Sequence, residues 1–215
     1  MASIKLKHAS GNSTILNSPA ANPSSDVTLK LPSTTGSAGQ VLQVASANHS
    51  ATNAELEFAA AAGGKFASYA VICDQKSLGT DGGTFTAGAW RTRDLNTELI
   101  DADGIVSISS NQFTLQAGTY FVEASAPAYK TNRHMIQLYQ TSGSATNIQE
   151  GTSMYASAGG AAYSVSSLFA RVTISGATTY EIRHYAETTE TDFGFGIGTD
   201  LSTEIYTVVK IFKES

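Results

Sequence analysis

At positions 204–212 the chain contains one of its two best-patterned strand segments, Glu204-Ile205-Tyr206-Thr207-Val208-Val209-Lys210-Ile211-Phe212. β-Branched and aromatic residues dominate the stretch, and such residues fit a pleated, half-buried strand. Apolar residues fill nearly every position instead of alternate ones, so both faces of the expected strand need covering. We therefore predict that residues 204–212 form a central strand of a β-sheet.

Short runs of the same character recur upstream, from Phe66 onward, with Gly, Ser, Asn and Asp between them. No window shows the 3.6-residue period of a helix. The predicted strands cover residues 66–73, 84–93, 104–108, 111–115, 119–129, 133–140, 147–155, 162–174, 178–186 and 204–212. About ten short strands with turn residues between them predict an all-β fold, a jelly-roll β-sandwich over residues 66–215.

The first 57 residues differ from the rest because they contain no Phe, Tyr or Trp. Aromatic side chains supply much of the buried area of a small domain, so this segment is too poor in apolar bulk to build a core of its own. Period-2 fragments at 4–7, 27–31 and 39–44 predict short strands with one apolar face each. We expect residues 1–57 to be an extended docking arm and residues 58–65, rich in Ala and Gly, to be a hinge. The apolar residues expected to dock are Ile4, Leu6, Val27, Leu29, Val41 and Leu42.

Composition excludes several classes of partner. Charged residues make up 14% of the chain and the net charge is -5, which argues against nucleic acid, since phosphate binding needs clustered Lys and Arg. No run approaches the roughly 20 apolar residues that span a bilayer, so no membrane insertion is expected. The single cysteine, Cys73, can form no intrachain disulfide and is predicted to be a small buried side chain.

Motifs of catalysis and of metal or cofactor binding are missing from the sequence. There is no Gly-x-Ser-x-Gly, no His-Glu-x-x-His and no phosphate loop, so we expect a protein that is not an enzyme and binds no cofactor. Strand alternation places His184 on the same face as Tyr180 and Ile182, and it is predicted to be a strand histidine with satisfied hydrogen bonds and not a ligand. The run 101–104 begins like a calcium loop but lacks the later ligands, and a turn is predicted there instead.

One acidic loop stands out before the last strand. It contains Glu187, Glu190 and Asp192 and is followed by the glycine-rich run 194–198, for which a flexible strand or bulge is predicted. The loop has two interpretations: a solvated connection, or a tip that meets a receptor glycan or a cation.

The order of segments in the head resembles that of the C1q/TNF-type jelly roll. The similar features are the apolar strand 66–73, the segment Trp90-Arg91-Thr92-Arg93, the run 113–121 and the apolar strand 204–212. This resemblance implies a homotrimer in which some aromatic residues line the threefold axis. The candidates are Phe113, Tyr120 and Tyr206; the residue pattern alone leaves open whether they fill the core of one chain instead.

The arm resembles the N-terminal module of fibre-like proteins of marine tailed phages. The similar stretches are residues 4–8, 26–32 and 36–43, with Gly39-Gln40-Val41-Leu42 the most specific among them. Together the two resemblances imply a virion structural protein, made in the host cytoplasm and displayed on the particle surface, whose arm binds other virion proteins. Its trimeric head would be a tail fibre or receptor-binding knob.

Two alternatives remain open. A capsid decoration protein of the same fold would use the arm to clamp neighbouring shell subunits. A carbohydrate-active enzyme would need paired carboxylates in a cleft, and the sparse acidic residues do not predict such a pair.

Overall fold

The computed structural model describes residues 3–7, 13–17, 28–45, 50, 53–61 and 64–215. Within these ranges every regular element is a β-strand, and no helix there is long and apolar enough to cross a membrane. The chain divides into two compact units, residues 1–62 and residues 63–215. We describe each unit by itself.

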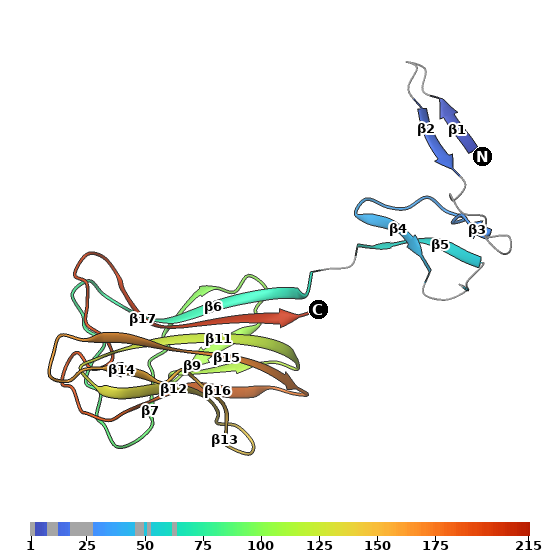
Figure 1. Ribbon diagram of the computed structural model, residues 1–215. Helices are drawn as coiled ribbons and strands as arrows, with labels where there is room; N and C mark the ends of the chain where they lie inside the picture. The colour runs from blue at the N-terminus through green and yellow to red at the C-terminus, as the bar shows by residue number, and fades with distance from the viewer. Residues whose placement is uncertain (1–2, 8–12, 18–27, 46–49, 51–52, 62–63) are drawn as a thin grey trace. The chain divides into compact units, whose positions relative to one another are not determined.

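The N-terminal unit contains two small sheets (Figure 1). Its strands are β1 (Ser3–Lys7), β2 (Ser13–Asn17), β3 (Thr28–Lys30), β4 (Gln40–Val44) and β5 (Asn53–Ala60). β1 and β2 form an antiparallel hairpin, while β5 lies between β3, to which it is parallel, and β4, to which it is antiparallel. The tight turn before β4 uses Gly39 at a φ of 84°, a conformation that glycine adopts without strain.

Three of these strands were predicted and two were not. β1, β3 and β4 coincide with the predicted fragments, whereas β2 and β5 are additional. β5 also corrects the predicted hinge, because it occupies residues 58–60 and pairs Phe58 with Leu42 of β4. The signal for β5 was present in the sequence: Glu55 and Glu57 alternate with Leu56 and Phe58, which is the period of a strand.

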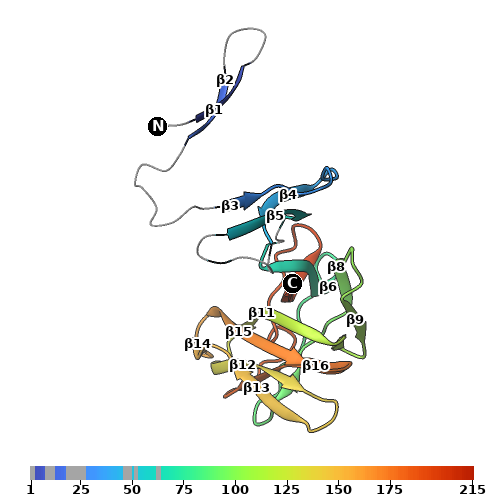
Figure 2. The same cartoon turned by 90° about the vertical axis from the view of Figure 1, so that its right-hand side faces the viewer.

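The C-terminal unit, called the head below, is a sandwich of two antiparallel sheets that lie face to face (Figures 1 and 2). The five-stranded sheet has the order β15 (Tyr163–Ile174), β11 (Gly118–Tyr129), β17 (Glu204–Glu214), β6 (Phe66–Lys76) and β8 (Thr97–Ile100). The seven-stranded sheet has the order β13 (Thr146–Glu150), β12 (Asn132–Gln140), β16 (Thr178–Ala186), β10 (Gln112–Leu115) and β9 (Val106–Ser109), with β14 (Met154–Ala156) beside β12 and β7 (Arg91–Thr92) beside β16. This is the predicted jelly-roll sandwich.

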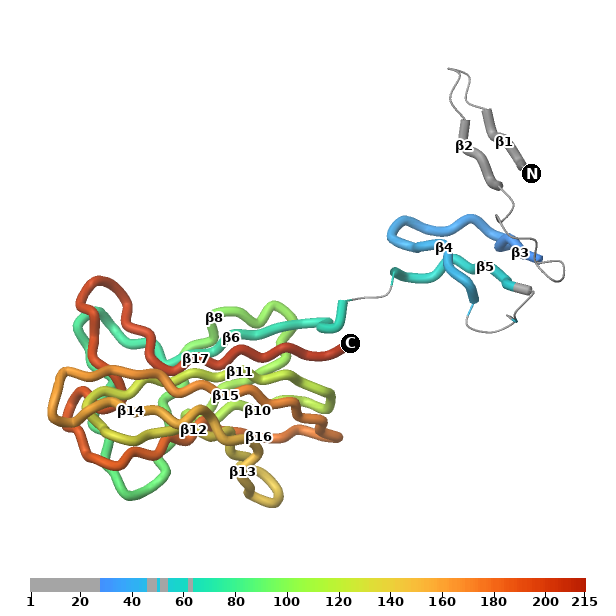
Figure 3. Tube along the Cα trace, viewed as in Figure 1, coloured from blue at the N-terminus to red at the C-terminus, as the bar shows by residue number. Residues whose placement is uncertain are grey.

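The first and last strands of the head pair with each other, as the chain trace in Figure 3 shows. β17 lies between β11 and β6 in the middle of its sheet, which confirms the prediction of a central strand for residues 204–212. Val209 and Ile211 of β17 are buried in the core, whereas Ile205 is 47% exposed and Lys210 is also exposed. The expected cover over both faces of the strand is therefore incomplete in the single chain.

The core lies between the two sheets and is built by alternation. Along β11 the side chains of Tyr120, Val122 and Ala124 are buried, and Phe121 and Glu123 between them point outward. The largest fully buried apolar side chains are Tyr120, Tyr180, Phe85, Phe113, Ile72, Leu95, Leu115, Ile136, Leu138, Leu168 and Ile182. One contiguous cluster therefore holds the two layers together.

Two predicted strands of the head were wrong in extent, and glycine explains both. In the predicted strand 84–93 only β7 forms, because Gly88 has a φ of 84°, which a strand does not accommodate. The predicted strand 147–155 is split into β13 and β14 around Gly151, where a Cβ atom would lie 2.8 Å from the side chain of Ile136. β8 was not predicted.

Candidate interaction surfaces

The outer face of the five-stranded sheet carries a line of aromatic rings, which we call the aromatic stripe. Its members are Phe66, Tyr69, Phe121, Phe169 and Phe212. Their ring centroids are 5.3 Å apart for Phe66 and Phe212, 6.5 Å for Phe121 and Phe212, and 6.4 Å for Phe121 and Phe169. Tyr69 lies opposite Phe212 in the strand register. The stripe thus crosses four strands, β15, β11, β17 and β6.

The stripe is open to solvent in the single chain. Phe169 is 55% exposed, Tyr69 51% and Phe66 44%. Contiguous exposed aromatic surface is unusual in a protein that stays monomeric and marks a site of association. The aromatic stripe is therefore a candidate contact surface for another protein chain.

Ion pairs flank the stripe. Lys210 contacts Glu123 at 3.0 Å, and Arg171 donates two hydrogen bonds of 2.8 Å to the carboxylate of Glu214. The hydrogen bond from Arg171 lowers the pKa of Glu214 to about 2, with further help from Lys65. An apolar centre with a polar rim is the usual anatomy of a protein–protein interface.

The residues predicted for the trimer core lie elsewhere. Phe113 and Tyr120 are fully buried within the chain and Tyr206 is 6% exposed, so they have almost no surface to offer another chain. They fill the protomer's own core, which corrects the prediction. The physical reason is strand alternation: Tyr120 points inward, so its neighbour Phe121 points outward and joins the stripe.

The sequence contained a signal for the stripe that the prediction did not use. Glu123 follows Phe121 by two residues, and Lys210 precedes Phe212 by two. Residues two apart share a face of the strand, and charged side chains are almost never fully buried unless they are paired. The face that carries Phe121 and Phe212 is therefore the outer one.

A second surface is a pocket on the outer face of the seven-stranded sheet, which we call the Tyr155 pocket. Its volume is about 700 Å³, within the range of small-molecule sites. The lining residues are Gly88, Arg133, His134, Met135, Ser153, Met154, Tyr155, Tyr185 and Glu187. Strands β12, β14 and β16 provide most of them, and loops on either side provide the others.

Strand register brings these side chains together. Arg133 of β12 lies opposite Tyr155 of β14, and Met135 of β12 lies opposite Tyr185 of β16. Arg133 Nη1 donates hydrogen bonds of 2.9 and 3.1 Å to the two carboxylate oxygens of Glu187. The backbone N–H of Arg133 also donates to Glu187 Oε2 at 3.2 Å. A fixed ion pair therefore stands between two exposed tyrosine rings.

The predicted receptor-facing loop contributes one of its three residues to this pocket. Glu187 lines the pocket. Glu190 instead forms a backbone bridge with Phe85, and Asp192 has a φ of 66° and donates its N–H to Thr84 Oγ1 at 3.1 Å. The structure therefore brings Glu187 to the candidate site without the other two acidic residues. Arg133 and Tyr155 were not predicted.

The interior of the head contains a buried arginine. Arg93 is 1% exposed; its Nε donates to Thr207 Oγ1 and its Nη2 to the carbonyl of Phe195, both at 2.8 Å. Its guanidinium lies 4.3 Å from the ring centroid of Phe195. Burial lowers the pKa of Arg93 to about 10, where it is still charged at neutral pH. Arg93 thus ties the segment before β8 to β17 and to the loop that precedes it.

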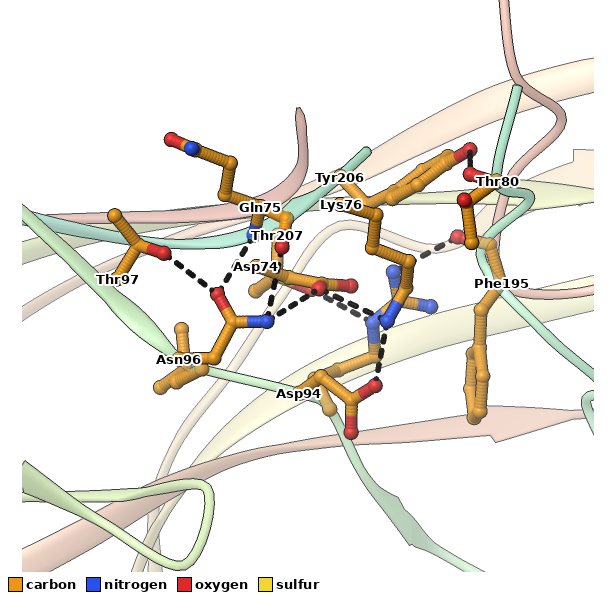
Figure 4. A network of polar contacts seen from close by, with 12 residues as sticks. Asp74, Gln75, Lys76, Thr80, Asp94, Asn96, Thr97, Phe195, Tyr206 and Thr207 are labelled. Atoms are coloured by element: carbon orange, nitrogen blue, oxygen red, sulfur yellow. Dashed lines mark hydrogen bonds and ion pairs between the residues drawn. The ribbon is translucent and has the colours of Figure 1, made fainter. Parts of the chain in front are cut away.

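Figure 4 shows the ion pairs near this arginine. Lys76 Nζ lies 3.1 Å from Asp74 Oδ1 and 2.9 Å from Asp94 Oδ2. Asp74 is 1% exposed, and burial raises its pKa while its hydrogen bond to Lys76 opposes the rise. Asn96 closes the network through hydrogen bonds with the backbone of Gln75. The charges at this end of the sandwich are therefore mutually compensated.

A pair of histidines occupies the interior beside the Tyr155 pocket. His134 Nδ1 lies 2.9 Å from His184 Nε2, and His134 Nε2 lies 2.7 Å from Ser164 Oγ. Burial is the main cause that lowers the pKa of His134 to about 4, and the positive charge of Arg93 adds to it. The same two causes, in the same order, lower the pKa of His184 well below its usual value. Both rings are neutral at pH 7. His184 is the predicted strand histidine and is buried, but its Nδ1 has no hydrogen-bond partner.

The glycine-rich run at 194–198 is part of a closely packed loop and not the predicted strand or bulge. A Cβ atom on Gly194 would lie 2.5 Å from Phe85 Cβ, and one on Gly196 would overlap the ring of Tyr206. The backbone N–H of Tyr129 donates a hydrogen bond of 3.2 Å to the carbonyl oxygen of Gly194. The glycines are needed because backbone passes directly over aromatic rings.

The apolar residues predicted for docking are exposed where their side chains are described. Leu29 is 58% exposed, Val41 42% and Leu42 49%. Ile4 and Leu6 belong to β1, and Val27 lies outside the described residues. Three exposed apolar side chains on short strands make this unit a second candidate contact surface.

Two further predictions are confirmed. Cys73 is buried and unpaired, and burial raises the pKa of its thiol. Residues 101–104 form a turn in which Asp101 accepts hydrogen bonds from the N–H groups of Ile105 and Val106, at 2.8 and 3.0 Å. Its carboxylate therefore caps the turn. Across the described part of the chain, no group of His, Cys, Asp and Glu is arranged to hold a metal ion.

Comparisons with known proteins bear on the fold. No protein-family model and no curated protein matches the sequence. Among solved structures, the chain is similar to the globular domain of zebrafish complement 1qA protein, with 20% identity over 67% of this chain and 95% of that one, at a TM-score of 0.44. It is also similar to murine APRIL, at 7% identity, 68% and 98% coverage and a TM-score of 0.47. A third similar structure is that of the PRD1 vertex protein P5, with 14% identity over 71% of this chain and 100% of that one, at a TM-score of 0.44.

Proposed function

We propose that the protein is a homotrimeric structural protein of a tailed-phage virion, anchored through residues 1–57, with a head that binds the host surface as a tail fibre or receptor-binding knob. It acts without catalysis and is displayed on the particle. The observation that carries the proposal is the aromatic stripe, an exposed line of rings on one face of an otherwise well-packed sandwich.

The stripe supports self-association because its charged neighbours are already paired within the chain. Glu123 with Lys210 and Glu214 with Arg171 satisfy one another, so the surface presents apolar area without unpaired charge. Burying a paired charge costs less than burying an unpaired one, which costs several kcal/mol. A second and third copy of the same chain provide equivalent faces. The proposal of three chains in the oligomer, and not two or four, follows from the resemblance of the head to the C1q/TNF-type jelly roll.

The virion role is supported by the character of the N-terminal unit. Its strands are short, Leu29, Val41 and Leu42 on them are exposed, and its sequence resembles the N-terminal module of fibre-like phage proteins. Small sheets of this kind gain stability when further strands or apolar surfaces cover them. We propose that other virion proteins provide the strands or apolar surfaces that cover these sheets. A trimeric head also suits receptor attachment, since three weak sites on one body bind with avidity.

Electron microscopy of intact particles, labelled with an antibody against the head, tests this proposal. Label at the tail supports the fibre or receptor-binding role. Label spread over the shell supports a capsid decoration protein instead, in which the exposed strands of the N-terminal unit would clamp shell subunits. Absence of the protein from purified particles would overturn the virion role altogether.

A further inference from the structure

We infer that the Tyr155 pocket binds a neutral pyranose sugar, the exposed unit of a surface glycan. The inference rests on the proposed receptor-binding role and adds to it the place of the site and the chemical class of the ligand. The sugar would lie on the tyrosine rings and be held by the Arg133–Glu187 pair.

The pocket offers exposed aromatic faces. Tyr155 is 58% exposed and Tyr185 38%, and both rings border the pocket. Trp90 packs edge-on against Tyr185, with ring centroids 5.6 Å apart, which holds that ring in place. The C–H face of a pyranose is flat and apolar, so it covers such a ring well, while a Tyr hydroxyl keeps a polar end in water.

The ion pair supplies the hydrogen bonds that sugar hydroxyls need. Each hydroxyl both donates and accepts. The guanidinium of Arg133 offers several N–H donors in a fixed fork and the carboxylate of Glu187 offers acceptors. Because each side chain holds the other at 2.9 Å, both are oriented before a ligand arrives. Arg133 is 77% exposed and Glu187 43%, so donors and acceptors remain within reach.

Charge distinguishes a neutral sugar from an acidic one. Arg133 and Glu187 are the charged residues that line the pocket, and their charges cancel. An anionic ligand would gain from the arginine and lose to the glutamate at a similar distance. A ligand without charge is therefore favoured, and a nucleic acid or a phosphate is not.

The volume and the apolar walls of the Tyr155 pocket also suit a sugar ligand. About 700 Å³ accommodates more than one sugar ring, given the usual dimensions of ligand sites. Met135 and Met154 form apolar walls, and their flexible thioethers adapt to ligands of slightly different shape. The pocket lies on the seven-stranded sheet and the aromatic stripe on the five-stranded one, so the two surfaces share no residue.

The test uses the full-length protein and saturation-transfer NMR with methyl glycosides of glucose, galactose and N-acetylglucosamine, beside methyl glycosides of glucuronic and sialic acid. We expect at least one neutral glycoside to bind in the millimolar range. Tyr155→Ala and Arg133→Ala should each weaken binding at least tenfold. Tyr163→Ala is the matched control, because Tyr163 has a similar exposure of 53% but belongs to the other sheet, and it should leave binding unchanged.

Three results would overturn the inference: no neutral glycoside binds, only the acidic ones bind, or binding survives Tyr155→Ala with the head folded by circular dichroism. These results concern the ligand alone. If labelled particles carry the protein and it binds no neutral sugar, the virion role stands and the sugar site falls. If the protein binds sugar but is absent from particles, the proposed function falls and the site stands.

Discussion

Phe121 of β11 lies directly opposite Phe212 of β17 on the outer face of the five-stranded sheet, with ring centroids 6.5 Å apart. This pair is the middle of the aromatic stripe. Each residue has an inward-pointing neighbour, Tyr120 and Ile211, that belongs to the core. The two central strands therefore have an apolar residue on either side, one set for the sandwich and one for association with another chain.

A charge in the stripe should dissociate the oligomer. In Phe169→Glu the carboxylate would have to be buried without a partner in every copy, which costs several kcal/mol. We expect the mass in solution to fall to that of one chain while circular dichroism still shows a β-protein. Leu201→Glu is the control, because Leu201 is 86% exposed and outside the stripe, and its mass should not change. An oligomer that survives Phe169→Glu would exclude the stripe as the interface.

Loss of the buried arginine should destabilise the head strongly. Arg93→Met keeps the apolar stem but removes the donors to Thr207 and Phe195 and the positive charge near Asp74. We expect the free energy of unfolding to fall by roughly 3–5 kcal/mol, as when one partner of a buried charged group is lost. Arg133→Met, at an exposed ion pair, should cost about 1 kcal/mol or less. Urea titration followed by the fluorescence of Trp90, the single tryptophan, measures both.

Acid should destabilise the head through the buried histidines His134 and His184. The pKa of His134 is about 4 in the folded chain against 6.5 as the ordinary value, and that of His184 is also lowered. Below pH 6.5 the unfolded chain therefore binds protons that the folded chain does not. Stability is full above pH 6.5 and is lost as the pH falls toward 4, by about 1.4 kcal/mol per pH unit for each histidine.

The same experiment separates the histidines from Glu214. The pKa of Glu214 is lowered from 4.5 to about 2, so its contribution is lost only below pH 4.5. Urea midpoints between pH 7 and pH 4.5 therefore report on His134 and His184, with a contribution of opposite sign from Asp74, whose raised pKa lets the folded chain bind a proton before the unfolded chain does. His134→Gln should flatten the dependence over this range. A wild-type midpoint that is constant from pH 7 to 4.5 would show that the histidines are not held neutral.

The glycine at 194 should not accept a side chain. In Gly194→Ala the new methyl group would collide with Phe85 and force the loop away from the core, at a cost of about 1–3 kcal/mol. Gly159→Ala is the matched control, because a Cβ atom at Gly159 meets nothing within 4 Å, and its melting temperature should stay within the error of the wild type. Equal melting temperatures for the two variants would contradict the packing described for this loop.

Most of the head's fold could be predicted because apolar and polar residues alternate clearly along its long strands. β11 and β17 carry enough apolar residues to specify both their conformation and their place in the sheet. The segment 84–93 misled the prediction because its composition is that of a strand, whereas Gly88 and the buried Arg93 impose a loop. β8 was missed because it is short and lies at the edge of its sheet, where a strand can form without a clear alternation of apolar and polar residues.

The candidate surfaces were harder to predict because they depend on register. Glu187 was singled out by its acidic loop, but its partner Arg133 precedes it by 54 residues and reaches it only through the pairing of β12 with β16. His134 and His184 are 50 residues apart for the same reason. For the stripe the information was local, since Glu123 marks the face of Phe121 as the outer one.

The mass of the full-length protein in solution, measured by native mass spectrometry and light scattering at micromolar concentration, shows whether the chain forms a trimer through the aromatic stripe. We expect a species of three times the 22.4 kDa of one chain that separates into single chains when Phe169 is replaced by Glu. A stable monomer at that concentration would contradict both the trimer and the role assigned to the aromatic stripe.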